Sequence, residues 1–166
     1  FAFVAEQIHR KTSWQTVICG SLEENSLAKK ISQKISIPVT DLTGKTTLTE
    51  LFQIISAARL VVSNETSGVH IAACVDTPSL CIVGGGHFGR FVPYSVDNCA
   101  GSNCPAVVFH YLGCFGCNWT KPCLPADDFT TIPPCISGIT TKKVLSAINE
   151  MLGFQHHKDA TKDRNK

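Results

Sequence analysis

Short apolar runs alternate with helical patterns through the first half of the chain, and this alternation limits the fold more than any other feature. The apolar runs lie at residues 16–19, near Val39, at residues 60–62 and at residues 80–83. Between them, apolar residues recur three or four positions apart, as on one face of a helix. Strands that alternate with helices of this length form a parallel sheet with right-handed crossovers. The sequence therefore predicts an α/β, Rossmann-like sheet with helices on both faces.

The expected helices can be placed from their caps and their apolar stripes. Ser21 offers an oxygen to the first amides of a helix over residues 22 to about 35, which Pro38 stops. The next helix would bury one stripe, formed by Leu48, Leu51, Phe52, Ile55 and Ala58. Further helices are expected over residues 1–11, from the end of the polar loop 63–68 through residue 74, and over residues 140–152.

Residues 84–137 interrupt the pattern, because they contain most of the eight prolines and six of the nine cysteines. We predict a long irregular excursion there, within a single domain that spans residues 1–153. Residues 154–166 are polar throughout and cannot bury enough apolar surface to stay ordered, which predicts a disordered tail. Phe1 is not an initiator and lies within a helical pattern, so the chain is expected to be a fragment.

The charge pattern argues against nucleic acid as a partner. The net charge of +2 arises from 15 basic and 13 acidic residues that are spread along the sequence, without a basic stripe or interleaved aromatic residues. No apolar run approaches the roughly 20 residues that cross a bilayer, and the first residues lack the basic region of a signal peptide. We expect a soluble, cytoplasmic protein without a transmembrane segment.

The stretch over residues 61–73 has the pattern of an anion site. A buried strand delivers small polar residues to the start of a helix, where free amides and the helix dipole favour phosphate oxygens. Thr66, Ser67 and Gly68 are small enough for a diphosphate to approach the backbone, at the edge where ligands of open α/β sheets lie. The alternative is that residues 63–66 only cap the helix and that His70 is structural.

Two motifs in this region resemble those of a known family. Residues 63–73 read Ser-Asn-Glu-Thr-Ser-Gly-Val-His-Ile-Ala-Ala, and residues 41–48 before them read Asp-Leu-Thr-Gly-Lys-Thr-Thr-Leu. Their order and separation resemble the signature of glycosyltransferase family 9, the ADP-heptose:lipopolysaccharide heptosyltransferases. The similarity extends over roughly residues 14–94.

The resemblance implies a GT-B enzyme of two domains, of which this chain would be the C-terminal one that binds the nucleotide sugar. Glu65 stands where the family has an aspartate that contacts the donor sugar, and the diphosphate would lie beside Thr66, Ser67 and His70. Two departures leave the donor sugar open. Glu65 is one methylene longer than the aspartate, and Ser67 replaces a glycine, with Gly68 one position later.

Other residues would complete this site. The resemblance implies that Thr46 and its neighbours lie near the nucleobase. It also implies that the nucleoside end is lined by Gly20, Ser21 and Glu24. In the loop after the last strand, His87 and Arg90 would approach the ligand.

The family reaction inverts the sugar's anomeric centre while the nucleoside diphosphate leaves. The implied partners are a nucleotide-diphosphate sugar such as ADP-heptose, a glycolipid acceptor of the lipopolysaccharide core or a related glycan, and the missing N-terminal domain. The general base is expected outside this chain, no cofactor is implied, and the protein would work in the cytoplasm, peripheral to the inner membrane. The alternative is a stand-alone module that binds a nucleotide without catalysis.

A rival motif lies at residues 84–89, Gly-Gly-Gly-His-Phe-Gly, which satisfies G-x-G-x-x-G after a strand. A dinucleotide site also needs a helix directly after the motif and an acidic residue about 20 residues on. Pro93 follows too closely for a regular helix to begin there. The sequence therefore disfavours dinucleotide binding.

The cysteines of residues 84–137 allow three states. Cys114 and Cys117 have metal-ligand spacing, so a zinc site would use Cys114, Cys117, Cys123 and Cys135. Free thiols packed under the excursion are the expected state, whereas an intracellular location disfavours disulfides, and nine cysteines leave at least one thiol unpaired. The remaining three, Cys19, Cys74 and Cys81, are expected to be small core residues.

Overall fold

The computed structural model describes residues 1–95, 104–118, 120, 123 and 132–153. Its elements follow one another in the order α1 (Ala2–Thr12), β1 (Thr16–Ile18), the 3-10 turn η1 (Leu22–Glu24), α2 (Asn25–Ser32), β2 (Val39–Asp41), α3 (Leu48–Ala57), β3 (Val61–Asn64), α4 (Ser67–Cys74), β4 (Ser79–Ile82), β5 (Ala106–Val108), α5 (Pro134–Ser137) and α6 (Thr141–Met151). The predicted tail over residues 154–166 lies outside the described residues.

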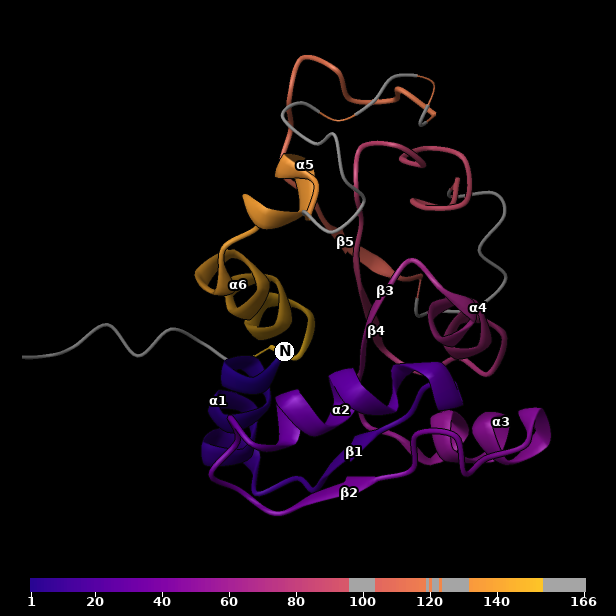
Figure 1. The fold of residues 1–166 in the computed structure, drawn as a ribbon, viewed down its shortest axis with the longest axis vertical. Helices are drawn as coiled ribbons and strands as arrows, with labels where there is room; N and C mark the ends of the chain where they lie inside the picture. The colour runs from indigo at the N-terminus through magenta and orange to yellow at the C-terminus, as the bar shows by residue number, and fades with distance from the viewer. Residues whose placement is uncertain (96–103, 119, 121–122, 124–131, 154–166) are drawn as a thin grey trace, which may run out of the picture.

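All strand pairs are parallel, which confirms the predicted sheet type. β1 pairs with β2, and β4 lies between β3 and β5. Figure 1 shows α6 on one side of β3–β4–β5 and α4 on the other, so helices cover both faces. β5 lies within residues 84–137, where we predicted an irregular excursion, so that prediction was wrong at residues 106–108.

The starts of α3 and η1 both carry reciprocal caps, of which only the one at Ser21 was predicted. α3 begins with a reciprocal pair, in which Glu50 N donates to Thr47 Oγ1 and Thr47 N donates to Glu50 Oε2. The helix expected from residue 22 begins instead as η1, where Ser21 N donates to Glu24 Oε2 over 2.7 Å. α2 then ends at Ser32, before the predicted residue 35.

Three clusters form the core of the described residues. The first packs α1 and α6 against β4 and β5, through Val4, Ile8, Leu80, Val108, Val144 and Ile148. The second joins α4 to β4 and the loop after β4, through Val69, Cys81, Val83 and Val92. The third packs α3 on α4, through Ile55, Ile71 and Ala72. The last two clusters hold α4 from two sides, and so fix its first turn just beyond the carboxyl end of β3.

The predicted apolar stripe of α3 is buried only in part. Ile55 is 5% exposed, but Leu48 is 65% and Phe52 37% exposed, so the stripe was wrong at these two residues. The buried contacts of α3 are made to α4, which covers only a narrow part of the helix. Among the described residues, no helix has both the length and the apolar character that spanning a membrane requires.

Candidate functional site

The junction between β3 and α4 is shorter than the polar loop predicted from the sequence. Ser63 and Asn64 complete the strand, Ser67 begins the helix, and only Glu65 and Thr66 lie between. Thr66 is the N-cap, but its side chain makes no cap hydrogen bond. Its hydroxyl lies 3.0 Å from Ser63 Oγ and donates weakly to Asn64 O over 3.5 Å. The first amides of α4 thus have no side-chain cap from Thr66, as an anion site requires.

The residues at this helix end are small. A Cβ added at Gly68 would make only an ordinary van der Waals contact, 3.6 Å from Ser63 Oγ, and Ser67 is exposed. The first turn of α4 is therefore not crowded, and the diphosphate at this turn stays a prediction.

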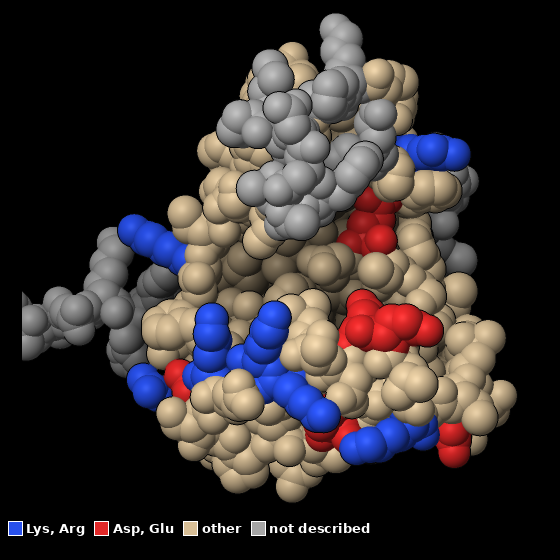
Figure 2. All heavy atoms as spheres, viewed as in Figure 1, with Lys and Arg blue, Asp and Glu red and all other residues tan. Residues whose placement is uncertain are grey.

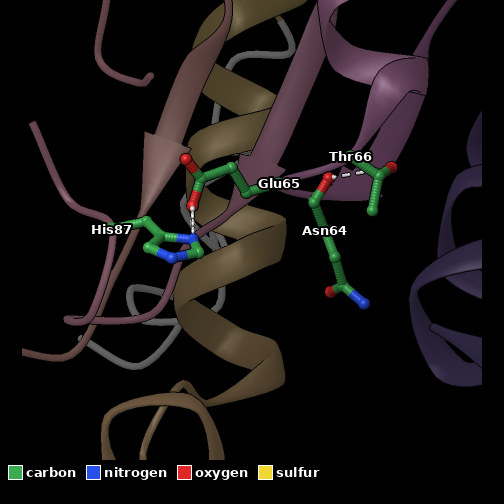
Figure 3. Close-up of polar contacts among 4 residues, drawn as sticks. All are labelled: Asn64, Glu65, Thr66 and His87. Atoms are coloured by element: carbon green, nitrogen blue, oxygen red, sulfur yellow. Dashed lines mark hydrogen bonds and ion pairs between the residues drawn. The ribbon is translucent and has the colours of Figure 1, made fainter. Parts of the chain in front are cut away.

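Glu65 points away from Thr66, toward the loop after β4 (Figure 3). Its side chain is only 11% exposed, and Oε2 lies 3.9 Å from His87 Nδ1. The other oxygen, Oε1, is buried and has no hydrogen-bond partner among the residues that the structure describes. Burial raises the pKa of Glu65 above its usual value, against the opposing effects of His87, His70 and Arg90. A buried carboxylate oxygen without a donor is costly, which marks Glu65 as a residue built to meet another group.

The loop after β4 folds back over α4. Val92 is fully buried in the cluster with Val69, and His70 Nδ1 lies 2.5 Å from Tyr94 Oη. Phe91 makes edge-to-face contacts with both His70 and His87. The structure thus brings both predicted histidines of the site to Glu65.

Arg90 has a different environment within the same loop. Its guanidinium lies 5.0 Å from the ring centre of Phe91. It also lines an open pocket of about 450 Å³ together with Phe88, Gly89, Gly116 and Asn118. The lining of this pocket includes none of the predicted residues of the β3–α4 junction.

No helix follows the glycine motif at residues 84–89. Residues 85–90 form turns, and residues 91–93 are bends. A dinucleotide fingerprint requires a helix whose first amides face the pyrophosphate, and residues 85–93 form none.

The residues predicted for the nucleoside end come together at the loops after β1 and β2. Gly44 N donates to Gly20 O over 2.9 Å, which joins the two loops near Thr46. Gly44 has a φ of +70°, and an added Cβ would lie 2.9 Å from Leu22 Cα, so only glycine fits this turn. Glu24 accepts from Ser21 N, so one of its oxygens serves as a cap. The roles of these residues toward a nucleoside remain predictions.

Figure 2 shows a hollow in the surface between the part that carries α2 and the part that carries α5. Acidic side chains lie along one side of this hollow, and Lys and Arg side chains gather over α2. The surface is therefore concave where the loops after the strands meet, which is where a ligand of an open α/β sheet binds.

The cysteines are in more than one state. Cys104 is disulfide-bonded, whereas the free thiols are Cys19, Cys74, Cys81, Cys114, Cys117, Cys123 and Cys135. Cys99 lies outside the described residues. Within the described part of the chain, no group of three or more His, Cys, Asp or Glu side chains is placed to hold a metal ion. Cys81 is buried as predicted, but Cys74 is exposed, so its assignment to the core was wrong.

Residues 1–106 match the sequence model of glycosyltransferase family 9 (heptosyltransferase). The chain belongs to this family. Among curated relatives, this family 9 chain is similar to lipopolysaccharide heptosyltransferase 3 of Escherichia coli, with 32% identity over 87 residues. The aligned part covers 51% of this chain but only 25% of the relative, so the chain represents a small part of such a protein.

Two solved structures share the fold of this family 9 chain. One is the E. coli ADP-heptose LPS heptosyltransferase II, with a TM-score of 0.65 and 20% identity over 92% of this chain and 40% of that one. The other is a family 9 glycosyltransferase from Veillonella parvula DSM 2008, with a TM-score of 0.67 and 18% identity over 93% and 41% of the two chains. The fold is thus one half of a GT-B glycosyltransferase, as the sequence predicts.

The sequence pointed to His87 and Arg90 in the loop after β4 but not to the residues of this loop that contact α4. Tyr94, Phe91 and Val92 lie in a segment read only as irregular, and their contacts with α4 depend on how the loop returns. The available signal for an anchored loop was an apolar residue, Val92, placed between the aromatic residues Phe91 and Tyr94.

Proposed function

We propose that this family 9 chain binds a nucleotide-diphosphate sugar, ADP-heptose, for inverting transfer to a glycolipid acceptor of the lipopolysaccharide core or a related glycan. The proposed setting is the cytoplasmic face of the inner membrane. A domain outside this chain would hold the acceptor and supply the general base, so the chain contributes donor binding and stabilisation of the leaving group.

The observation that carries this proposal is the buried Oε1 of Glu65, which has no partner within the described part of the chain. A sugar hydroxyl is the natural partner, because it donates to a carboxylate without bringing a charge of its own. His87 lies near the other oxygen and favours the ionised form, which is the better acceptor. Glu65 would therefore recognise a hydroxyl of the donor sugar.

The start of α4 suits the diphosphate. Thr66 does not cap the helix, and small residues leave its first turn uncrowded. Negative charge grows on the leaving diphosphate during transfer, and helix amides that are already oriented stabilise it without reorganisation. His70, in the same helix, would add a hydrogen-bond donor.

Calorimetric titration of the protein with ADP, UDP, GDP and ADP-heptose tests this assignment. We expect ADP-heptose to bind most tightly, Glu65→Ala to weaken ADP-heptose more than ADP, and His70→Ala to weaken both. Glu150→Ala is the matched control, because Glu150 is exposed on α6. If neither site substitution weakens any nucleotide that binds, the site is wrong. Binding without transfer in the complete protein would instead favour the non-catalytic module.

A further inference from the structure

Tyr94 makes an unusually close pair with His70. Its Oη lies 2.5 Å from His70 Nδ1, and the two rings are stacked, with centroids 5.8 Å apart and planes 23° apart. The proposed function assigns Tyr94 no part, although the contact joins the loop after β4 to the helix at the centre of the site.

The loop is anchored so that Tyr94 reaches this position. Val92, two residues earlier, has no exposed surface and packs with Val69 and Val83. Gly89 N donates to Val92 O over 2.8 Å, which closes the turn before the anchor. Phe91 packs edge-on against His70 from the same loop. The His70 ring is therefore held from two sides by residues whose backbone is fixed in the core.

The chemistry of the pair favours the phenol as the donor, because a bare imidazole nitrogen is a better acceptor than a phenol oxygen. A neutral imidazole has one N–H and one bare nitrogen, and the nitrogen that accepts a hydrogen bond leaves the proton on the other. Burial raises the pKa of Tyr94, so its phenol keeps its proton. The titratable groups near the pair are Glu65 in the β3–α4 junction, Cys74 in α4 and Cys81 in β4.

We propose that Tyr94 is a positioning residue, which donates its O–H to Nδ1 and so holds His70 with its proton on Nε2. His70 then presents an N–H donor to an oxygen of the ligand's diphosphate. The second statement rests on the proposed function, whereas the first concerns the protein alone. The same contact fixes the plane of the ring, so Tyr94 sets both the tautomer and the direction of the donor.

The tautomer can be measured directly by long-range ¹H–¹⁵N correlation on the complete protein labelled with [¹⁵N]histidine, without ligand. The signals of His70 are identified from their loss in His70→Gln. In the native protein at neutral pH, we expect a protonated Nε2 and an unprotonated Nδ1 at His70. A protonated Nδ1 would overturn the proposal, and this measurement needs no Tyr94 variant to fold.

Tyr94→Phe keeps the ring and removes only the hydroxyl. We expect a mixture of both tautomers at His70, and ADP affinity about three- to tenfold lower, the loss typical of one hydrogen bond. Tyr111→Phe is the matched control, because Tyr111 is 69% exposed and its ring packs on Phe115 with the two planes 41° apart. An unchanged tautomer in Tyr94→Phe, or ADP affinity equal to that of the native protein, would overturn the proposal. If the native protein binds no nucleotide, the proposed function fails, and the tautomer measurement alone decides the role of Tyr94.

Discussion

Four carboxylates at the same edge of the fold form two groups with opposite surroundings. After β1 and β2, Glu24, Asp41 and Glu50 each accept a hydrogen bond from a backbone amide of their own loop, over 2.7 to 2.9 Å. After β3, Glu65 is mostly buried and one of its oxygens has no partner among the described residues.

The pKa values of Asp41 and Glu50 move in the opposite direction to that of Glu65. Hydrogen bonds from Thr43 lower the pKa of Asp41, and those from Thr47 lower the pKa of Glu50. Burial raises the pKa of Glu65. The first group stabilises local structure, whereas the burial of Glu65 costs stability and no described residue donates to its Oε1, as expected of a residue that meets a ligand. This difference separates capping residues from candidate ligand-binding residues within a single class of side chain.

The largest effect is expected from Glu65→Gln. The amide keeps the shape of the side chain but is a weaker acceptor than the ionised carboxylate, so ADP-heptose affinity should fall about ten- to hundredfold, the range of ~1.5–3 kcal/mol for a hydrogen bond to a charged group. ADP, which lacks the heptose, should bind almost as before. Calorimetry with both ligands measures the ratio.

Glu150→Gln, on the exposed part of α6, should change neither affinity. An equal loss for ADP and ADP-heptose in Glu65→Gln would show that Glu65 supports the fold of the loop and not the recognition of the sugar. The comparison between the two groups of carboxylates would then lose its functional meaning.

The alternation of strands and helices allowed most of the fold to be predicted. It failed at β5, because Ala106-Val107-Val108 is too short to show a pattern and lies among prolines and cysteines. Only its pairing with β4 makes it a strand, and that pairing is not encoded locally. The predicted burial of Leu48 and Phe52 was also wrong, because helical spacing defines an apolar face but not the neighbour that covers it.

The candidate site was predictable where it depends on one junction. Glu65, Thr66, Ser67, Gly68 and His70 follow one strand and begin one helix, so their proximity follows from local structure. Tyr94 lies 24 positions from His70, and its contact depends on Val92 being buried against α4. Contacts of this kind come from the packing of a returning loop, which spacing in a single sequence does not reveal.

A smaller effect, on stability alone, is expected in the capping group. Thr47→Ala removes the oxygen that accepts from Glu50 N at the start of α3, and should lower the free energy of unfolding by ~1 kcal/mol. Thr49→Ala is the matched control, because Thr49 is exposed in the first turn of the same helix. Urea unfolding gives the free energies. An equal loss of stability in Thr49→Ala would show that the oxygen of Thr47 is not what stabilises the start of α3.

The smallest expected effect is on how stability depends on pH, where Glu50 and Glu65 should act in opposite directions. The pKa of Glu50 is lowered in the folded protein, so its contribution to stability is present above its usual value of 4.5 and is lost as the pH falls. The pKa of Glu65 is raised, so the folded state holds the proton more tightly, and this carboxyl destabilises the fold as the pH rises above 4.5. Relative to the native protein, Glu50→Gln should therefore lose stability as the pH rises from about 3 to 6, whereas Glu65→Gln should gain stability. Both changes should occur within roughly one to two pH units of the two pKa values. Urea unfolding of the three proteins across this range measures both trends. Parallel trends in the two variants would mean that Glu65 finds a donor in the ligand-free protein, and the distinction between capping and ligand-binding carboxylates would fail at its central residue.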